Sequence, residues 1–233
     1  MSTENRENSV GAAPLTDDCG GPLDEVWLWK QVQRCVKEKP GPCEEVDSGY
    51  AVMRGKSGSK VHYLLVPTER IKGIECPTIW KPGATDYWLA AANRVPTYFH
   101  GQGMTVGLGI NSKYRRDEEQ LHIHMVAFAT NAAQDLKEKD KSIPTSASQW
   151  KSAIFPVRGH ASSDTRNYRV LRVDNFADNP FSLLRNHVLT ADSQMQYQMM
   201  VMIPRAKGYY ILNSESSLSG GTDSIDHLLK TGT

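Results

Sequence analysis

The chain has 233 residues and a formal net charge of +1, with 27 Lys and Arg against 26 Asp and Glu. This balance excludes a polycation for nucleic acid or a charged membrane surface, so any recognition of an anion must be local. No window approaches about 18 uninterrupted apolar residues, and no membrane-spanning helix is expected.

The first residues are polar, rich in Ser, Asn, Glu and Gly, and they lack the apolar segment of a signal peptide. We therefore predict a disordered leader over residues 1–22 and a single domain over residues 23–233. Without an export signal, the expected location is cytoplasmic.

Four cysteines, Cys19, Cys35, Cys43 and Cys76, are too few for a disulfide scaffold and show no Cys-x-x-Cys spacing. Cys35 and Cys43 flank a turn that contains Pro and Gly, and an oxidising compartment would allow them to pair. Because cytosolic thiols are kept reduced, free thiols are the favoured prediction.

Helix and strand signals alternate along the first half of the chain. Asp24 can cap a helix that runs to about Lys37, where Pro40-Gly-Pro42 stops it, and a second helix should open at Thr85 and end near Pro96. The strands predicted here are 50–54, 61–66 and 105–110, and the first two should form a hairpin around a Gly-containing turn.

The second half has a similar mixture. Helices are expected at 131–142, after Asn179-Pro180, and at 225–229, with a loop at 143–153 and strands at 154–157, 168–173, 194–203 and 209–212. Because the spacing is not that of regular βαβ units, the pattern favours an α+β fold with a mainly antiparallel sheet and flanking helices. The hairpins at 50–66 and 194–212 look alike and suggest two similar halves.

The most informative segment contains two histidines. Residues 120–128 alternate as a strand does, so Gln120, His122 and His124 should project from one face, while Leu121, Ile123 and Met125 enter the core. Side chains two apart on a strand have Cα atoms about 6.6 Å apart. A cluster of cationic and hydrogen-bonding side chains precedes them, and this combination suits chemistry on a phosphate.

Other interpretations of the two histidines remain open. They could be satisfied core residues, or two ligands of a zinc, iron or manganese ion, although no third ligand stands at a recognisable spacing. A two-histidine phosphoesterase would need a second His-x-Thr/Ser copy, which the chain lacks. No metal and no cofactor are therefore expected, and the remaining histidines are expected to be surface, packing or structural residues: His62, His100, His160, His187 and His227.

Nucleophilic attack on phosphorus is the favoured interpretation. A neutral imidazole, with an ordinary pKa of about 6.5, is available near neutral pH without activation by a metal. It would attack an activated phosphate to give a phosphoramidate that water then hydrolyses.

The segment Gln120-Leu-His122-Ile-His124 resembles the His-φ-His-φ-His motif of the histidine-triad (HIT) superfamily, with Gln in place of the first His. The likeness is closest to the CDP-diacylglycerol pyrophosphatases, in which Leu-x-x-Asn-Ser-Arg precedes Gln-Phe-His-Ile-His; here the first of these motifs is Leu108-Gly-Ile-Asn111-Ser112-Lys113. Other short matches occur in order along the chain: 42–47, 49–50, 63–71, 73–75, 158–160, 179–181 and 226–227.

This resemblance implies a HIT-like α+β fold and an enzyme that hydrolyses CDP-diacylglycerol to CMP and phosphatidate. It implies that His122 is the nucleophile, that His124 contacts the phosphate or braces His122, and that Gln120 replaces the lost histidine. The residues expected at the substrate's phosphates are Asn111, Ser112, Lys113, Arg116 and Arg70.

The chain also departs from the family pattern. Arg115 stands where the family tends to have Gly, and Lys113 replaces an expected Arg, which turns a bidentate fork into a point charge. A polar leader stands where relatives have an export signal or membrane anchor. Two alternatives therefore accompany the pyrophosphatase: a member recruited to specialised metabolism that acts on a non-nucleotide small molecule, and a nucleotide-binding module without turnover.

The expected partner is a small molecule, either a nucleotide-lipid, another activated phosphate or a metabolite. We expect no nucleic acid partner and no integral membrane span. The weakly charged surface permits a homodimer.

Overall fold

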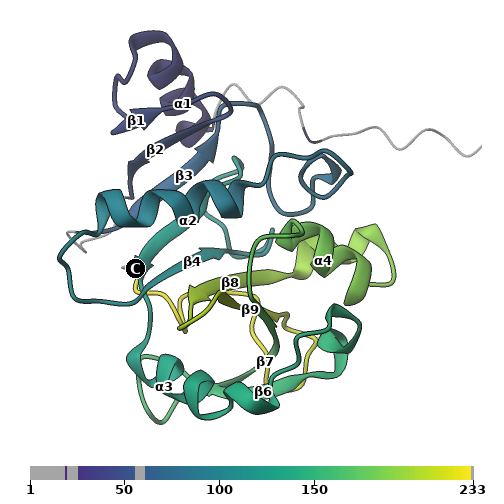
Figure 1. Cartoon of the computed structure of the whole chain (residues 1–233). Helices are drawn as coiled ribbons and strands as arrows, with labels where there is room; N and C mark the ends of the chain where they lie inside the picture. Colours follow the sequence, from purple (N-terminus) through teal and green to yellow (C-terminus); the bar gives the residue numbers. More distant parts are fainter. Residues whose placement is uncertain (1–18, 20–25, 56–60, 232–233) are drawn as a thin grey trace, which may run out of the picture.

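The computed structural model describes residues 19, 26–55 and 61–231. Within that part of the chain, nine strands form one sheet in the order β1-β2-β3-β5-β4-β8-β9-β7-β6, and all neighbouring strands are antiparallel (Figure 1). The strands are β1 Glu45–Val46, β2 Tyr50–Arg54, β3 Tyr63–Pro67, β4 Val106–Ile110, β5 Ile123–Ala127, β6 Ile154–Arg158, β7 Thr165–Val173, β8 Met199–Pro204 and β9 Tyr209–Ser214. The predicted α+β class with a mainly antiparallel sheet is confirmed.

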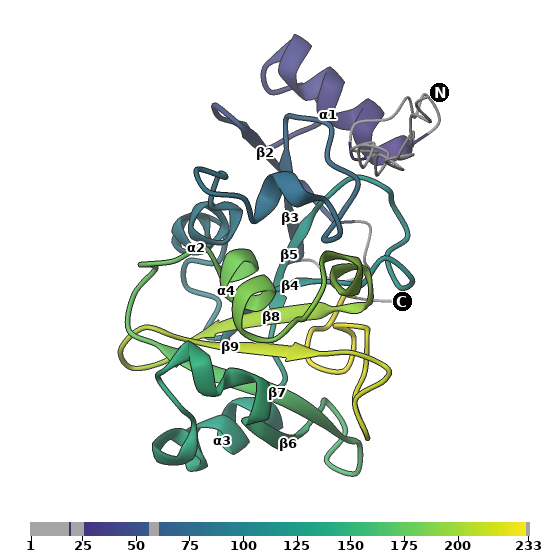
Figure 2. The same ribbon diagram turned by 90° about the vertical axis from the view of Figure 1, so that its right-hand side faces the viewer.

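The described helices cover the sheet from both sides. They are α1 Trp27–Glu38, α2 Tyr87–Tyr98, α3 Thr130–Glu138 and α4 Pro180–His187, with short 3-10 turns at η2 Pro77–Ile79, η3 Asp140–Ser142, η4 Ala147–Ser152 and η5 Asp192–Tyr197. Figure 2 shows α2 and α4 on the same side of the sheet. No helix in this part of the chain is both long enough and apolar enough to cross a bilayer.

The face that α2 and α4 cover carries a single large apolar cluster. Trp88 of α2 and Phe181 of α4 belong to it, together with Ile123 and Met125 of β5. All four side chains are fully buried. The alternation of residues 121–125 thus places Leu121, Ile123 and Met125 in the core, as predicted.

The opposite face has two separate apolar clusters instead of one. Near the β2 edge, Leu28 and Val32 of α1 pack on Leu64. Toward β6 and β7, α3 packs with Leu136 against Leu212. Directly paired residues in antiparallel strands share a face, and His124 pairs with both Leu64 and Gly109. The histidine therefore lies on this face, between the two clusters.

The strand order repeats within the chain. β2 and β3, α2, then β4 and β5 are followed by β6 and β7, α4, then β8 and β9. In the sheet, the series β2-β3-β5-β4 meets the reversed series β8-β9-β7-β6 at the β4–β8 pair. By position, the counterpart of β2–β3 is therefore β6–β7, and not the 194–212 hairpin whose sequence looked similar. A duplication stays a prediction.

Several predicted boundaries differ from the structure. The strand around the histidines begins only at Ile123, so Gln120 and His122 lie in the segment that leads into it. Residues 192–197 form η5 instead of the first part of a strand, and 225–229 form a turn that ends in a bridge between Leu229 and Phe128 instead of a helix. The proposed cap at Asp24 lies outside the described residues.

The prediction of free thiols is wrong. Cys35 pairs with Cys43, and Cys19 pairs with Cys76, so all four cysteines form disulfides. The first joins α1 to the segment before β1, and Cys35 is fully buried against β2. The second spans 57 residues, a pairing that sequence spacing does not suggest.

The C-terminal segment packs on β4 at two glycines. A Cβ at Gly107 or Gly109 would collide with the side chain of Leu229. The absence of side chains there lets the segment lie close to the sheet, where Ala129 and Leu228 form a backbone hydrogen bond. This contact brings residues from the end of the chain beside the histidines.

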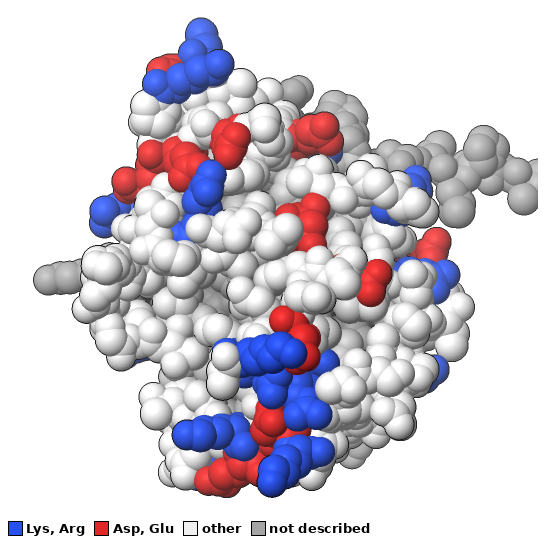
Figure 3. All heavy atoms as spheres, viewed as in Figure 1, with Lys and Arg blue, Asp and Glu red and all other residues white. Residues whose placement is uncertain are grey.

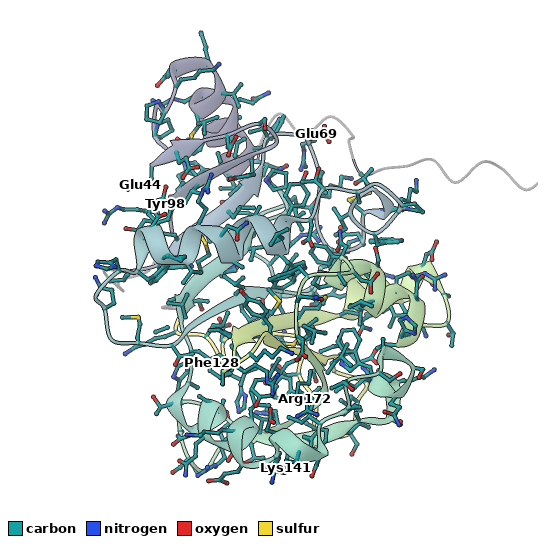
Figure 4. All side chains as sticks on the ribbon, in the orientation of Figure 1. Glu44, Glu69, Tyr98, Phe128, Lys141 and Arg172 are labelled. Atoms are coloured by element: carbon teal, nitrogen blue, oxygen red, sulfur yellow. A yellow bond between two sulfur atoms is a disulfide. The ribbon has the colours of Figure 1, made fainter. Side chains whose placement is uncertain are left out.

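Charged side chains gather at one end of the molecule. Figure 3 shows Lys and Arg mixed with Asp and Glu at its lower end, while most of the visible face is uncharged. Figure 4 labels Arg172 on β7 and Lys141 in the neighbouring turn. Arg172 and Arg205 both bind Asp140, and Lys207 binds Asp174. Arg172, Arg205 and Lys207 are therefore each paired with a carboxylate.

Candidate active site

A cavity of about 230 Å³ lies where the two apolar clusters leave the sheet uncovered. His124 of β5 lines it, with His62 and His122 from the residues directly before β3 and β5, and Trp27 and Leu28 line it from the first turn of α1. Its other wall residues are Arg54, Leu64, Asn111, Arg115, Asp117, Glu118, Asp226 and Thr231. The cavity thus combines residues from both ends of the chain.

His122 has a fixed orientation. Its Nδ1 lies 2.7 Å from the backbone carbonyl oxygen of Gln120. A carbonyl oxygen only accepts hydrogen bonds, so Nδ1 carries the proton in the neutral ring and Nε2 carries the lone pair. The side chain is 8% exposed, and it lines the cavity. This is the tautomer that an imidazole nucleophile needs.

His124 is bound to a histidine that sequence analysis had set aside. Nδ1 of His124 lies 2.9 Å from Nε2 of His62, so one of the two rings donates to the other. The ring centroids of His122 and His124 are 4.9 Å apart. Nε2 of His124 is buried and has no hydrogen-bond partner in the described part of the chain. Buried polar atoms nearly always have a partner, so this nitrogen is a candidate contact for a ligand group in the adjoining cavity.

All three imidazoles favour the neutral form. Burial, and then the charge of His122, lowers the pKa of His62 to about 4. Burial is also the main reason why the pKa of His122 is lowered and that of His124 lies well below its usual value. The carboxylates of Glu118 and Asp117 raise the pKa of His122 and only partly oppose its burial.

Gln120 and Arg70 form a buried support behind His122. Arg70 Nη1 donates to Gln120 Oε1 at 2.8 Å, and Gln120 Nε2 donates to the carbonyl oxygens of Pro67 and Glu69. Gln120 is fully buried. Neither side chain lines the cavity, so the structure places both next to the histidines but behind the wall.

Asn111 is the predicted phosphate-binding residue that the structure brings to the cavity. Its Oδ1 accepts a hydrogen bond from the backbone nitrogen of Ile225, which ties the C-terminal segment to this loop. Ser112 is fully buried and donates to Asp223. Lys113 is exposed and does not line the cavity.

Arg116 is neutralised within the protein. Its guanidinium donates to both carboxylate oxygens of Glu75, at 2.6 and 2.7 Å, and also reaches Glu119. Its side chain is only 5% exposed. The guanidinium groups that line the cavity are those of Arg54 and Arg115, and each also binds a carboxylate, Glu44 and Asp223 respectively.

In the described part of the chain, no three His, Cys, Asp or Glu side chains form a group that could hold a metal ion. The arrangement is instead a neutral imidazole with a defined tautomer, a second imidazole with an unpartnered nitrogen, and two guanidinium groups at the wall. Chemically, this site can deliver a nitrogen nucleophile to an anionic centre.

Comparison with known families agrees with this chemistry. A family model described as CDP-diacylglycerol pyrophosphatase matches residues 24–231, nearly the whole chain. The chain belongs to the CDP-diacylglycerol pyrophosphatase family. The resemblance drawn from the short motifs is thereby confirmed, and membership makes the chain a hydrolase that acts on phosphoric anhydrides, with a lipid-nucleotide as the fitting substrate.

Three residues of the cavity wall were not among the site residues predicted from the sequence. His62, Arg54 and Arg115 all line the cavity, but His62 directly precedes β3, Arg54 ends β2 and Arg115 lies in a loop. His62 is 62 residues from His124 in sequence. The predicted hairpin at 50–66 already indicated that Arg54 and His62 lie close together. The sequence did not indicate that this hairpin pairs with the histidine strand β5.

Proposed function

We propose that the chain hydrolyses CDP-diacylglycerol to CMP and phosphatidate through a covalent adduct on His122. The observation that carries the proposal is the hydrogen bond from His122 Nδ1 to the Gln120 carbonyl, because it leaves Nε2 as the nucleophilic atom of a ring at the cavity wall. The lowered pKa of His122 keeps that nitrogen unprotonated at neutral pH.

The reaction has two steps. His122 Nε2 attacks one phosphorus of the anhydride, a P–N bond forms, and the bridging P–O bond breaks with its electron pair leaving on the other phosphate. Water then attacks the same phosphorus, the P–N bond breaks, and the electron pair returns to Nε2. One proton of the water is released to solvent, and the enzyme returns to its starting state.

The remaining site residues have distinct proposed roles. His124 would contact the non-bridging oxygens through its unpartnered Nε2, with Asn111 beside it. Lys113 would reach the outer phosphate from the surface. Four residues behind the wall would hold the loop and the nucleophile in place: Gln120, Ser112, Arg116 and Arg70. We also propose that the fold is HIT-like.

The His122→Ala variant tests the nucleophile. Turnover of CDP-diacylglycerol should fall by several orders of magnitude while substrate binding stays intact, because the side chain that forms the covalent bond is lost. His187→Ala, an exposed histidine on α4, is the matched control. Isolation of the wild-type adduct under alkaline quench should place the added mass on His122. A His122→Ala enzyme with normal turnover would refute the mechanism.

A second candidate function rests on the charges at the cavity. Three carboxylates, Asp117, Glu118 and Asp226, share the wall with two guanidinium groups, although the anhydride is anionic. A family member recruited to specialised metabolism, which acts on a non-nucleotide small molecule without covalent catalysis, would suit such a mixed wall. That enzyme would keep its activity in the His122→Ala variant and would not release CMP.

The cytoplasmic location stays a prediction, and the disulfides oppose it. Disulfides are rare in proteins of the reducing cytosol and persist in oxidising compartments. We infer that the chain with both pairs, Cys35–Cys43 and Cys19–Cys76, folds in an oxidising compartment. Alkylation of the protein taken directly from its source cells should find no reactive thiol; four labelled cysteines would restore the cytoplasmic prediction.

A further inference from the structure

The cavity lined by His62, His122 and His124 also contains a carboxylate that has no role in the reaction proposed above. Asp117 lines the cavity and is exposed. It makes no hydrogen bond and no ion pair in the described part of the chain, and its charge acts on His122. The negative charge of a carboxylate repels an anionic substrate, so its position at this wall calls for an explanation.

The other carboxylates at this wall already have structural partners. Glu118 accepts a hydrogen bond at 3.2 Å from the backbone nitrogen of Leu28, so it satisfies a donor at the start of α1. Asp226 accepts from the hydroxyls of Ser224 and Thr231, one on each carboxylate oxygen. Asp117 is therefore the carboxylate that has both its oxygens available to the cavity.

The chemistry of the two steps shows where a carboxylate is useful. The first step expels a phosphate, which leaves as an anion and needs no proton. The second step uses water, whose pKa of about 15.7 makes it a poor nucleophile unless a base accepts its proton.

We propose that Asp117 is the general base of the second step, which rests on the covalent mechanism proposed above. Its carboxylate accepts a proton from the water as the water oxygen bonds to phosphorus. The P–N bond breaks at the same time, and its electron pair returns to Nε2 of His122. Because Asp117 is exposed, the proton passes from its carboxyl group to solvent before the next cycle.

The test separates the two steps in the Asp117→Asn variant. With CDP-diacylglycerol in detergent micelles, rapid-quench measurement should show a first-turnover burst like that of the wild type, followed by a steady state about 10²–10³-fold slower. The covalent adduct on His122 should accumulate, as measured by intact-protein mass after alkaline quench. Hydroxylamine attacks as a neutral amine and needs no base, so it should speed the loss of the adduct.

Asp178→Asn makes the same chemical change at an exposed site before α4 and should leave both phases unchanged. A steady-state rate of Asp117→Asn within a few-fold of this control would overturn the proposal, and so would an equal loss of burst and steady state. If His122→Ala is inactive while Asp117→Asn is normal, only the role of Asp117 fails. If His122→Ala remains active, the covalent mechanism fails and the role of Asp117 fails with it.

Discussion

The two halves of the sheet have the same order of strands, but their buried polar groups differ in where they lie. In the second half, Arg169 binds Glu215 and Asn213, and Gln198 binds the same two residues. In the first half, the chain of His122, His124 and His62 ends in an unpartnered Nε2 at a cavity. Each network leaves one buried nitrogen without a partner, Arg169 Nε and His124 Nε2, but the histidine network lines a cavity that can receive a ligand.

The largest effect is expected from a change in the polar network around Arg169. Arg169→Met should lower the free energy of unfolding by roughly 3 kcal/mol, because it leaves the partly buried Glu215 carboxylate without its cation. Turnover per folded molecule should not change. Urea titration and active-site-normalised rates measure the two quantities.

Arg166→Met on the same strand is the control for that change. Its ion pair with Asp164 is about half exposed on both sides, so its loss should cost less than about 1 kcal/mol. If Arg169→Met and Arg166→Met lower the free energy of unfolding equally, the network around Arg169 contributes no more to stability than an exposed ion pair.

Acid should affect the first half through its histidines. Because the pKa of His62 falls to about 4 on folding, the unfolded chain binds more protons between pH 6.5 and 4. Stability should be fully present above pH 6.5 and should fall by up to roughly 3 kcal/mol as the pH approaches 4. Urea midpoints across this range should fall less in His62→Leu; an equal decline would contradict the assignment.

The Cys35–Cys43 disulfide tests how far the cavity depends on α1. Loss of a loop this short should remove about 2.5 kcal/mol by chain entropy, since the cysteines are eight residues apart. Cys35→Ser with Cys43→Ser should therefore lower the midpoint of unfolding. Because Trp27 and Leu28 of α1 line the cavity, KM should rise as well. An unchanged KM would show that α1 keeps its position without the bond.

The smallest effect concerns the partner of His124. His62→Leu should lower kcat about 10–100-fold, because the ring of His124 loses the hydrogen bond that fixes its tautomer. His62→Gln places an amide near the same position and should recover part of the rate. His100→Leu, at an exposed histidine, is the control. If Gln and Leu give equal rates, His62 serves packing alone.

Local signals were sufficient for the core pattern of the histidine strand and for the family. The alternation at 121–125 predicted which side chains enter the core, and the short motifs with His122 and His124 identified the family. Both follow from residues that are close in sequence, where strand periodicity and motif spacing act directly.

Contacts between distant segments were not accessible in this way. Glu75 neutralises Arg116 across 41 residues, and Cys19 meets Cys76 across 57. The sequence showed Arg116 as a cation near the histidines, but whether a guanidinium faces a substrate or a carboxylate depends on which segment packs beside it.

By itself, then, the sequence determined the type of fold, the family and the position of the two histidines on one strand face, because these depend on periodicity and on short motifs. Only the tertiary structure decided which groups surround that pair: the pairing of β3 with β5 brings His62 to His124, and two glycines of β4 admit the C-terminal segment that carries Asp226. The physical reason is that strand order and close packing bring together residues that are far apart in sequence. Neither the distance between them along the chain nor a local motif predicts these contacts.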